Sequence, residues 1–356
     1  MAFASLREED EGEESEQSAI EATKWYERDF DLQVKRTSFF LVGAAQCGMA
    51  TLHEGLRSHP QICVPASDDP QRFWLDQEPY HFCGDSGSAD WLRVVSGDDY
   101  RNLLEAAPPN AKCGIATGWK LFSQDALQRM KEFEPNAKIV LMLCPPITWM
   151  RSWHHEMLRY AYEDQVDFGQ ALAMEKERSQ GLKLPRYVPS KECLQYRKAA
   201  RFSEQVKAYY ELFGKDQVFV GLLEDMQDEE ADFQGRLLEF LEVDSSVNFE
   251  TSGMNDAHFL KGTHHFDLAV GRVVKRLPGG SKIKQWFTKS MEPNYRNLMD
   301  KIFAPMSDQS INSILEEELL EEFEEEVDSL SRLIGRDLSH WNTPRFPRDE
   351  GGHHHH

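Results

Sequence analysis

Apolar runs of strand length alternate with segments of helical periodicity along most of the chain. Continuous apolar runs predict buried parallel strands at residues 38–42, 138–143 and 218–223. The spacing of apolar residues predicts helices at 51–58, 149–163, 203–213 and 233–241. Because strands and helices alternate, we expect an α/β fold of three layers, in which helices flank a central parallel sheet.

The two ends of the chain differ in character from this middle. Residues 8–16 hold seven acidic side chains and no aromatic or branched one, which predicts a disordered acidic tail over residues 1–17. Residues 346–356 are predicted to be a second tail that ends in an expression tag, so its histidines are left out of metal-site reasoning. No internal repeat is visible between the tails, and we expect a single domain over residues 18–345.

Two further segments complete this outline. A short helix is predicted at residues 18–29, and the segment 64–98, rich in Pro, Asp, Gly and aromatic residues, is predicted to form loops that line a pocket. Residues 316–328 hold nine acidic side chains, which we expect on the solvated side of a helix. The apolar stripe of that helix would be Leu315, Leu319, Phe323, Val327 and Leu330.

The net charge of −21 is concentrated in the two acidic segments, and without their 16 acids it falls to about −5. No cluster of Lys and Arg is available to neutralise a polyanion, so nucleic acid and highly sulfated glycans are not expected as partners. No run of eighteen apolar residues predicts a transmembrane helix, and the acidic N-terminus does not resemble a signal peptide.

The cysteines suggest a reducing environment. They are six in number, and none forms a CxxC pair or a zinc-like spacing. In a chain of 356 residues, scattered cysteines predict buried thiols rather than a disulfide framework. We therefore expect a cytoplasmic or other soluble reducing compartment.

A glycine-rich turn follows the first predicted strand. Gly43 and Gly48 are five residues apart between a strand and a helix, which lets backbone N–H groups converge at the helix N-terminus, as in a phosphate site. Met49 and Ala50 stand where a nucleoside triphosphatase has its lysine and hydroxyl, which argues against that class. A glycine-rich turn that binds nothing is the alternative.

Four motifs in matching order resemble sulfotransferases that use the donor 3′-phosphoadenosine 5′-phosphosulfate (PAPS), and the carbohydrate sulfotransferases most of all. Residues 39–60 resemble the phosphosulfate loop, FFLVGxPKCGTTxLxxxLxxHP, and 135–152 resemble the 3′-phosphate strand, PxAKIIxLLRNPxxRxxS. Residues 213–241 and 333–341 resemble two later motifs of the family. The resemblance implies the sulfotransferase fold, with a P-loop-like donor loop. It also implies sulfuryl transfer from PAPS.

The resemblance places the donor site on two segments. The residues that would contact PAPS are Gly43, Gln46, Cys47, Gly48, Met49, Ala50, Thr51, Cys144 and Ser152. Gln46 stands where the family has its catalytic lysine, and Cys144 stands where it has the arginine of the 3′-phosphate site. Met49 and Ala50 replace the two loop hydroxyls. Losing these contacts removes roughly 5 kcal/mol of donor binding, at about 1.5–3 kcal/mol for each charge-assisted hydrogen bond.

The family's catalytic base is a carboxylate or histidine beyond the first helix. Asp69 has the expected distance from the loop, whereas Glu78 and His81 lie in a stretch whose letters match better but which requires an insertion. No metal is expected, because adjacent histidines such as His154 and His155 point about 100° apart on a helix.

Three functions remain open from the sequence. The first is a sulfotransferase with replacement contacts, acting on a small molecule or a neutral sugar. The second is a repurposed enzyme that does acid–base chemistry without PAPS, and the third is a non-catalytic binding protein. The replacement cations for the first would come from Arg57, Arg151, Lys261, Arg272, Lys275 or Arg276.

Overall fold

The computed structural model describes residues 37–64, 104–116, 121–159, 162–185, 188, 190–249 and 313–344. The predicted helix at 18–29 and the predicted pocket loops beyond residue 64, up to 98, lie outside these ranges. No helix within the described ranges is long and apolar enough to cross a membrane.

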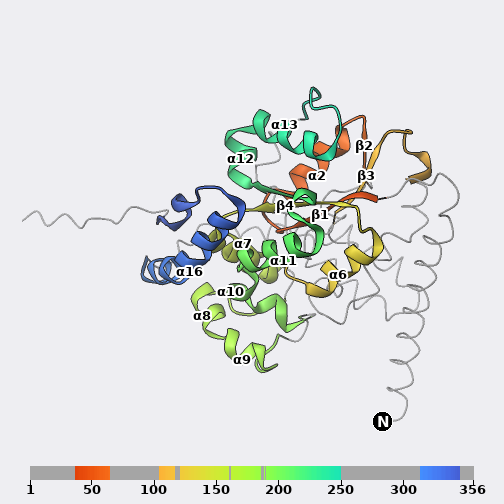
Figure 1. Cartoon of the computed structure of the whole chain (residues 1–356). Coiled ribbons are helices and arrows are strands. Elements are labelled where there is room, and N and C mark those ends of the chain that lie inside the picture. Colours follow the sequence, from red (N-terminus) through yellow and green to blue (C-terminus); the bar gives the residue numbers. More distant parts are fainter. Residues whose placement is uncertain are drawn as a thin grey trace, which may run out of the picture.

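A parallel sheet of five strands forms the centre of the described structure (Figure 1). The strand order is β2-β3-β1-β4-β5. The strands are β1 (Thr37–Gly43), β2 (Ile62–Cys63), β3 (Lys112–Ala116), β4 (Lys138–Leu143) and β5 (Val218–Leu222). β1 and β4 pair in parallel, and both are buried along most of their length, as their continuous apolar sequences predict.

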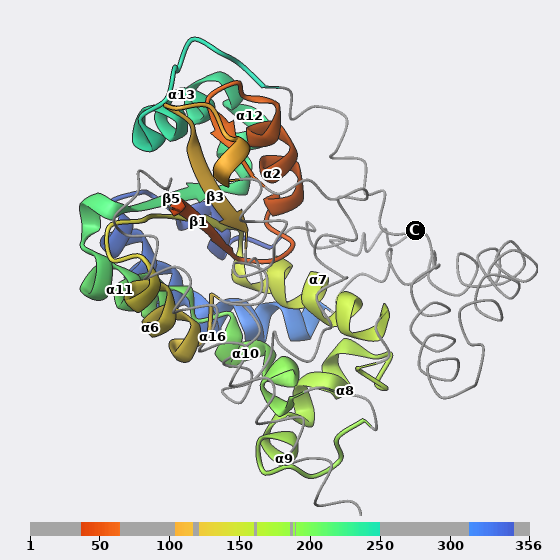
Figure 2. The same ribbon diagram turned by 90° about the vertical axis from the view of Figure 1, so that its right-hand side faces the viewer.

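Helices cover both faces of the sheet, as Figures 1 and 2 show. One face carries α2 (Met49–Ser58), α12 (Leu223–Asp228) and α13 (Glu230–Leu241). The other carries α6 (Gln124–Phe133), α7 (Pro146–Arg159), α11 (Phe202–Phe213) and α16 (Ser313–Ile334). The predicted α/β fold with a central parallel sheet is confirmed.

Smaller helices extend the layer below α7. They are α8 (Phe168–Ala173), α9 (Glu175–Ser179), η3 (Lys191–Leu194) and α10 (Tyr196–Ala199). Two further short turns are η4 (Lys215–Gln217) and η5 (Ser339–Asn342). The predicted helix at 149–163 is displaced, since α7 begins at Pro146, whose ring suits the first turn of a helix.

A buried ion pair and a tyrosine hydroxyl join Glu163, in the segment after α7, to α9 and α10. Glu163 and Arg178 are fully buried, with hydrogen bonds of 2.6 and 2.7 Å between guanidinium and carboxylate. The Tyr196 hydroxyl donates to the same carboxylate at 2.7 Å. Burial raises the pKa of Glu163, but the hydrogen bonds from Arg178 and Tyr196 outweigh it and keep the pKa below its usual value.

The acidic helix α16 packs its apolar stripe into the core. Four stripe residues, Leu319, Phe323, Val327 and Leu330, are buried, as their spacing predicts. The expectation that all the acids of residues 316–328 are solvated is wrong for Glu316 and Glu326, which are buried. Glu326 lies against the start of α11. Its carboxylate accepts from the backbone N–H and the hydroxyl of Ser203, at 2.6 and 2.7 Å. Glu326 therefore satisfies an amide of the first turn of α11 that has no partner within that helix.

Candidate functional site

The turn of residues 43–48 lies between β1 and α2, as the glycine spacing predicts. Three of its residues have positive φ, namely Gly43 at 144°, Gln46 at 65° and Gly48 at 81°. Gly48 caps α2, and no side-chain hydrogen bond accompanies this cap in the described structure. The first turn of α2 thus presents backbone N–H groups at the carboxyl edge of the sheet, where an anion is favoured.

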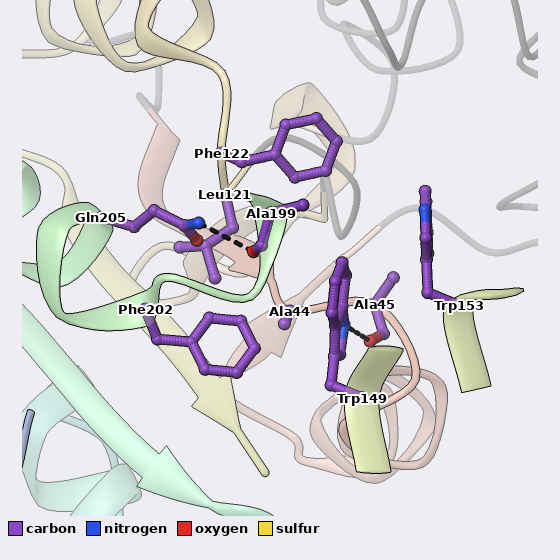
Figure 3. A pocket seen from close by; sticks show the side chains of 9 residues that line it. All are labelled: Ala44, Ala45, Leu121, Phe122, Trp149, Trp153, Ala199, Phe202 and Gln205. Carbon is purple, nitrogen blue, oxygen red and sulfur yellow. Dashed lines mark hydrogen bonds between the residues drawn. The ribbon is translucent and has the colours of Figure 1, made fainter. Parts of the chain in front are cut away.

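Backbone and indole contacts hold this turn against β4 and α7. The N–H of Ala44 donates to Met142 O of β4 at 2.6 Å. The indole Nε1 of Trp149, on α7, donates to Ala45 O at 2.8 Å, as Figure 3 shows. Within the turn, the N–H of Cys47 donates to Ala44 O at 3.2 Å. The turn is therefore positioned by the neighbouring strand and the helix that follows it.

A disulfide joins Cys47 in this turn to Cys144, the residue directly after β4. The two Cα atoms lie 5.6 Å apart, within the range of disulfide bonds. The expectation that the cysteines are buried thiols is therefore wrong for this pair, and Cys193 is disulfide-bonded as well. Cys113 is a buried free thiol, and Cys63 is a half-buried one. Sequence spacing missed the link because β1 and β4, 97 residues apart at these cysteines, become neighbours only in the sheet.

The other side chains of the predicted donor site lie in different surroundings. Gln46 is exposed, whereas the side chains of Met49 and Thr51 are buried. Ser152 is half-buried on α7. The side chain of Ala50 is not among those described. The predicted bases Asp69, Glu78 and His81 lie outside the described residues, and the structure neither brings them to the site nor separates them from it.

Two of the six candidate replacement cations, Arg57 and Arg151, lie within the described residues. Arg57 is exposed and pairs with Glu54 at 3.1 Å, as a surface charge does. Arg151 lines an open pocket at the start of α7, together with Thr148 and His340. Glu316 also lines this pocket, so its walls carry both signs of charge. The other four candidates, Lys261, Arg272, Lys275 and Arg276, lie outside the described residues.

No histidine of α2 supplies a positive charge to the turn at neutral pH. His53 is buried, and burial lowers its pKa to about 4 despite the neighbouring Glu54 carboxylate. The described parts of the chain contain no group of three or more His, Cys, Asp or Glu side chains that could hold a metal ion.

A small apolar pocket adjoins the turn at Ala44 and Ala45 (Figure 3). Trp149 and Trp153 stack with ring centroids 5.4 Å apart and form one part of its lining. Gln205 contributes the polar group, with Nε2 donating to Ala199 O at 2.9 Å. Its Oε1 is buried and accepts no hydrogen bond within the described structure. The lining is otherwise aromatic and apolar.

Comparison with known proteins supplies the fold's identity. A sulfotransferase from Alicyclobacillus acidocaldarius is similar in structure, with a TM-score of 0.57 and 25% sequence identity over 87% of this chain and 100% of that chain. This chain has the sulfotransferase fold. The sulfotransferase domain from the curacin biosynthetic pathway is less similar, with a TM-score of 0.37 and 15% identity over 59% of this chain and 75% of that one, too low to argue from.

No family model matches the sequence, and no curated protein matches it either. The sulfotransferase fold of this chain thus rests on the architecture and on the structural similarity. The turn of residues 43–48 lies between β1 and α2, beside the end of β4, and the Cys47–Cys144 disulfide joins it to the residue that follows β4.

Proposed function

We propose that this chain transfers a sulfuryl group from PAPS to a hydroxyl or amine of a small molecule or neutral sugar, at an atypical donor site. The observation that carries the proposal is the turn of residues 43–48, which presents the N-terminus of α2 at the carboxyl edge of a sulfotransferase-fold sheet. The similarity to a whole sulfotransferase chain supports the same reaction class.

The residues present fit the donor in part. The amides of the first turn of α2 would hold the 5′-phosphosulfate, and Gln46, which is exposed at the turn, would donate a neutral hydrogen bond. Ser152 and Arg151 on α7 would hold the 3′-phosphate. PAPS, when bound, supplies the sulfuryl group. A base among Asp69, Glu78 and His81 would take the proton of the acceptor.

The fit fails at two cations. Gln46 stands where the resemblance predicts a lysine, and Cys144, which forms a disulfide with Cys47, stands where it predicts an arginine. This disulfide favours a second candidate, an enzyme that has kept the fold but does acid–base chemistry on a small molecule without PAPS. A cytoplasmic or other reducing compartment, and the absence of nucleic-acid partners, stay predictions in both cases.

Calorimetric titration with adenosine 3′,5′-bisphosphate, the desulfated product, separates the two candidates. The sulfotransferase proposal expects binding that weakens by about tenfold in Arg151→Gln, since one charge-assisted contact is worth roughly 1.5–3 kcal/mol. Arg57→Gln is the matched control, because Arg57 is an exposed arginine paired with Glu54, and it should bind as the unaltered chain does. Absence of binding at millimolar nucleotide, in both oxidised and reduced protein, would favour the enzyme without PAPS.

A further inference from the structure

The disulfide links two segments that otherwise touch through few hydrogen bonds. Cys47 belongs to the turn before α2, and Cys144 belongs to the short segment between β4 and α7. Besides the S–S bond, the described contacts of the turn with β4 and α7 include the Ala44 N–H bond to Met142 O and the Trp149 indole bond to Ala45 O. The disulfide is thus the covalent part of a small set of anchors.

Both cysteines lie at the same place relative to a helix. Cys47 precedes the first residue of α2 by two positions, and Cys144 precedes the first residue of α7 by two. A thiolate is stabilised near a helix N-terminus, because the helix dipole and the unpaired N–H groups there favour negative charge. Stabilising the two reduced sulfurs makes a disulfide easier to reduce.

The environment of the pair limits how reduction takes place. Both cysteines are buried, which disfavours charge and blocks direct attack in the closed turn. Gln46, next to Cys47, is exposed, so the turn lies at the surface of the described structure. Thiol–disulfide exchange at this pair therefore requires the turn to open. The redox state of the pair is thus coupled to the position of the turn.

We propose that Cys47 and Cys144 form a reversible redox site that fixes or frees the turn of residues 43–48, with a dithiol as the reductant. The dithiol gives two electrons and two protons, and its own sulfurs form a disulfide. The Cys47–Cys144 bond breaks, and each sulfur leaves as a thiol. In the oxidised chain the turn is held to β4; in the reduced chain only hydrogen bonds and packing hold it.

The first test maps the thiols of the whole chain across dithiothreitol buffers of defined potential, by alkylation and peptide mass spectrometry. Cys47 and Cys144 should change together as one two-electron couple. Cys113, which the structure shows as a buried thiol, should not follow that transition. Finding Cys47 and Cys144 as thiols in protein purified without reductant would overturn the proposal.

The second test measures amide hydrogen exchange in the oxidised and reduced protein. Reduction should speed exchange in residues 44–52 by at least about tenfold more than in β5, because the turn opens locally, whereas β5 responds only to the loss of global stability. Cys144→Ser, or Cys144→Ala if the serine variant fails to fold, should exchange as the reduced chain does without reductant. Cys63→Ser is the matched control and should keep the response.

Two results of this exchange experiment would contradict the redox site. Unchanged exchange in residues 44–52 after verified reduction would show that the disulfide does not hold the turn. Equal acceleration in 44–52 and in β5 would show that the disulfide only supports the whole fold. Neither measurement uses a nucleotide, so failure of PAPS binding and failure of this redox site are separate outcomes.

Discussion

Reducing the Cys47–Cys144 disulfide should lower the stability of the whole fold by a calculable amount. The bond closes a loop with a sequence separation of 97 residues, and it constrains the unfolded chain far more than the folded one. The chain-entropy relation gives about 4.7 kcal/mol for a loop near this length, and disulfides typically contribute about 2–4 kcal/mol in practice. We expect a loss of roughly 2–5 kcal/mol on reduction.

The assay is thermal unfolding of the unaltered chain and of Cys144→Ala, each with and without a phosphine reductant. A loss of about 3 kcal/mol corresponds to a shift in Tm of roughly 6–12 °C for a unit of 150–250 residues. The shift in the variant is subtracted, so that effects of reductant elsewhere in the chain cancel. A subtracted shift under about 1 °C, with both thiols verified as reduced, would refute the reasoning.

Three further outcomes follow from other contacts. Glu163→Ala should cost about 3–5 kcal/mol in denaturant unfolding, because it leaves the buried Arg178 guanidinium without its main partner; a cost below about 1 kcal/mol would contradict the pairing. Gly48→Ala should cost about 1–3 kcal/mol in the same assay, because φ is 81° there. Burial raises the pKa of Asp225, but its hydrogen bonds to Arg336 outweigh this and lower it, so their stabilisation is present above the unfolded pKa of about 3.9 and is lost as the pH falls further. Arg336→Gln should therefore be less stable than the unaltered chain at neutral pH, with a difference that shrinks below about pH 4.

Three strands of the sheet could be predicted because their apolar runs are continuous. β1, β4 and β5 are buried along most of their length, and such strands show in sequence as unbroken apolar segments. β2 has two residues and β3 has five with a central glycine, and neither gives a pattern that sequence reasoning can separate from a loop. The pairing of β3 with β1, and of β2 with β3, depends on tertiary contacts.

The position of the glycine-rich turn was predictable, and its sulfur chemistry was not. The sequence placed Gly43 and Gly48 between a buried strand and a helix, where the structure has them. The pairing of Cys47 with Cys144 needed the order of strands in the sheet. One signal was present: each cysteine lies near the carboxyl end of a buried strand, and parallel strands bring those ends to one edge of the sheet.

The most direct test of the proposed function is chromatographic detection of adenosine 3′,5′-bisphosphate released from PAPS. The reaction would contain the full chain, reduced or oxidised, and a panel of small alcohols, amines and neutral sugars. The sulfotransferase proposal predicts nucleotide release that depends on an acceptor and matches a sulfated product in amount. Release that no acceptor stimulates, or none at all in either redox state, would contradict it.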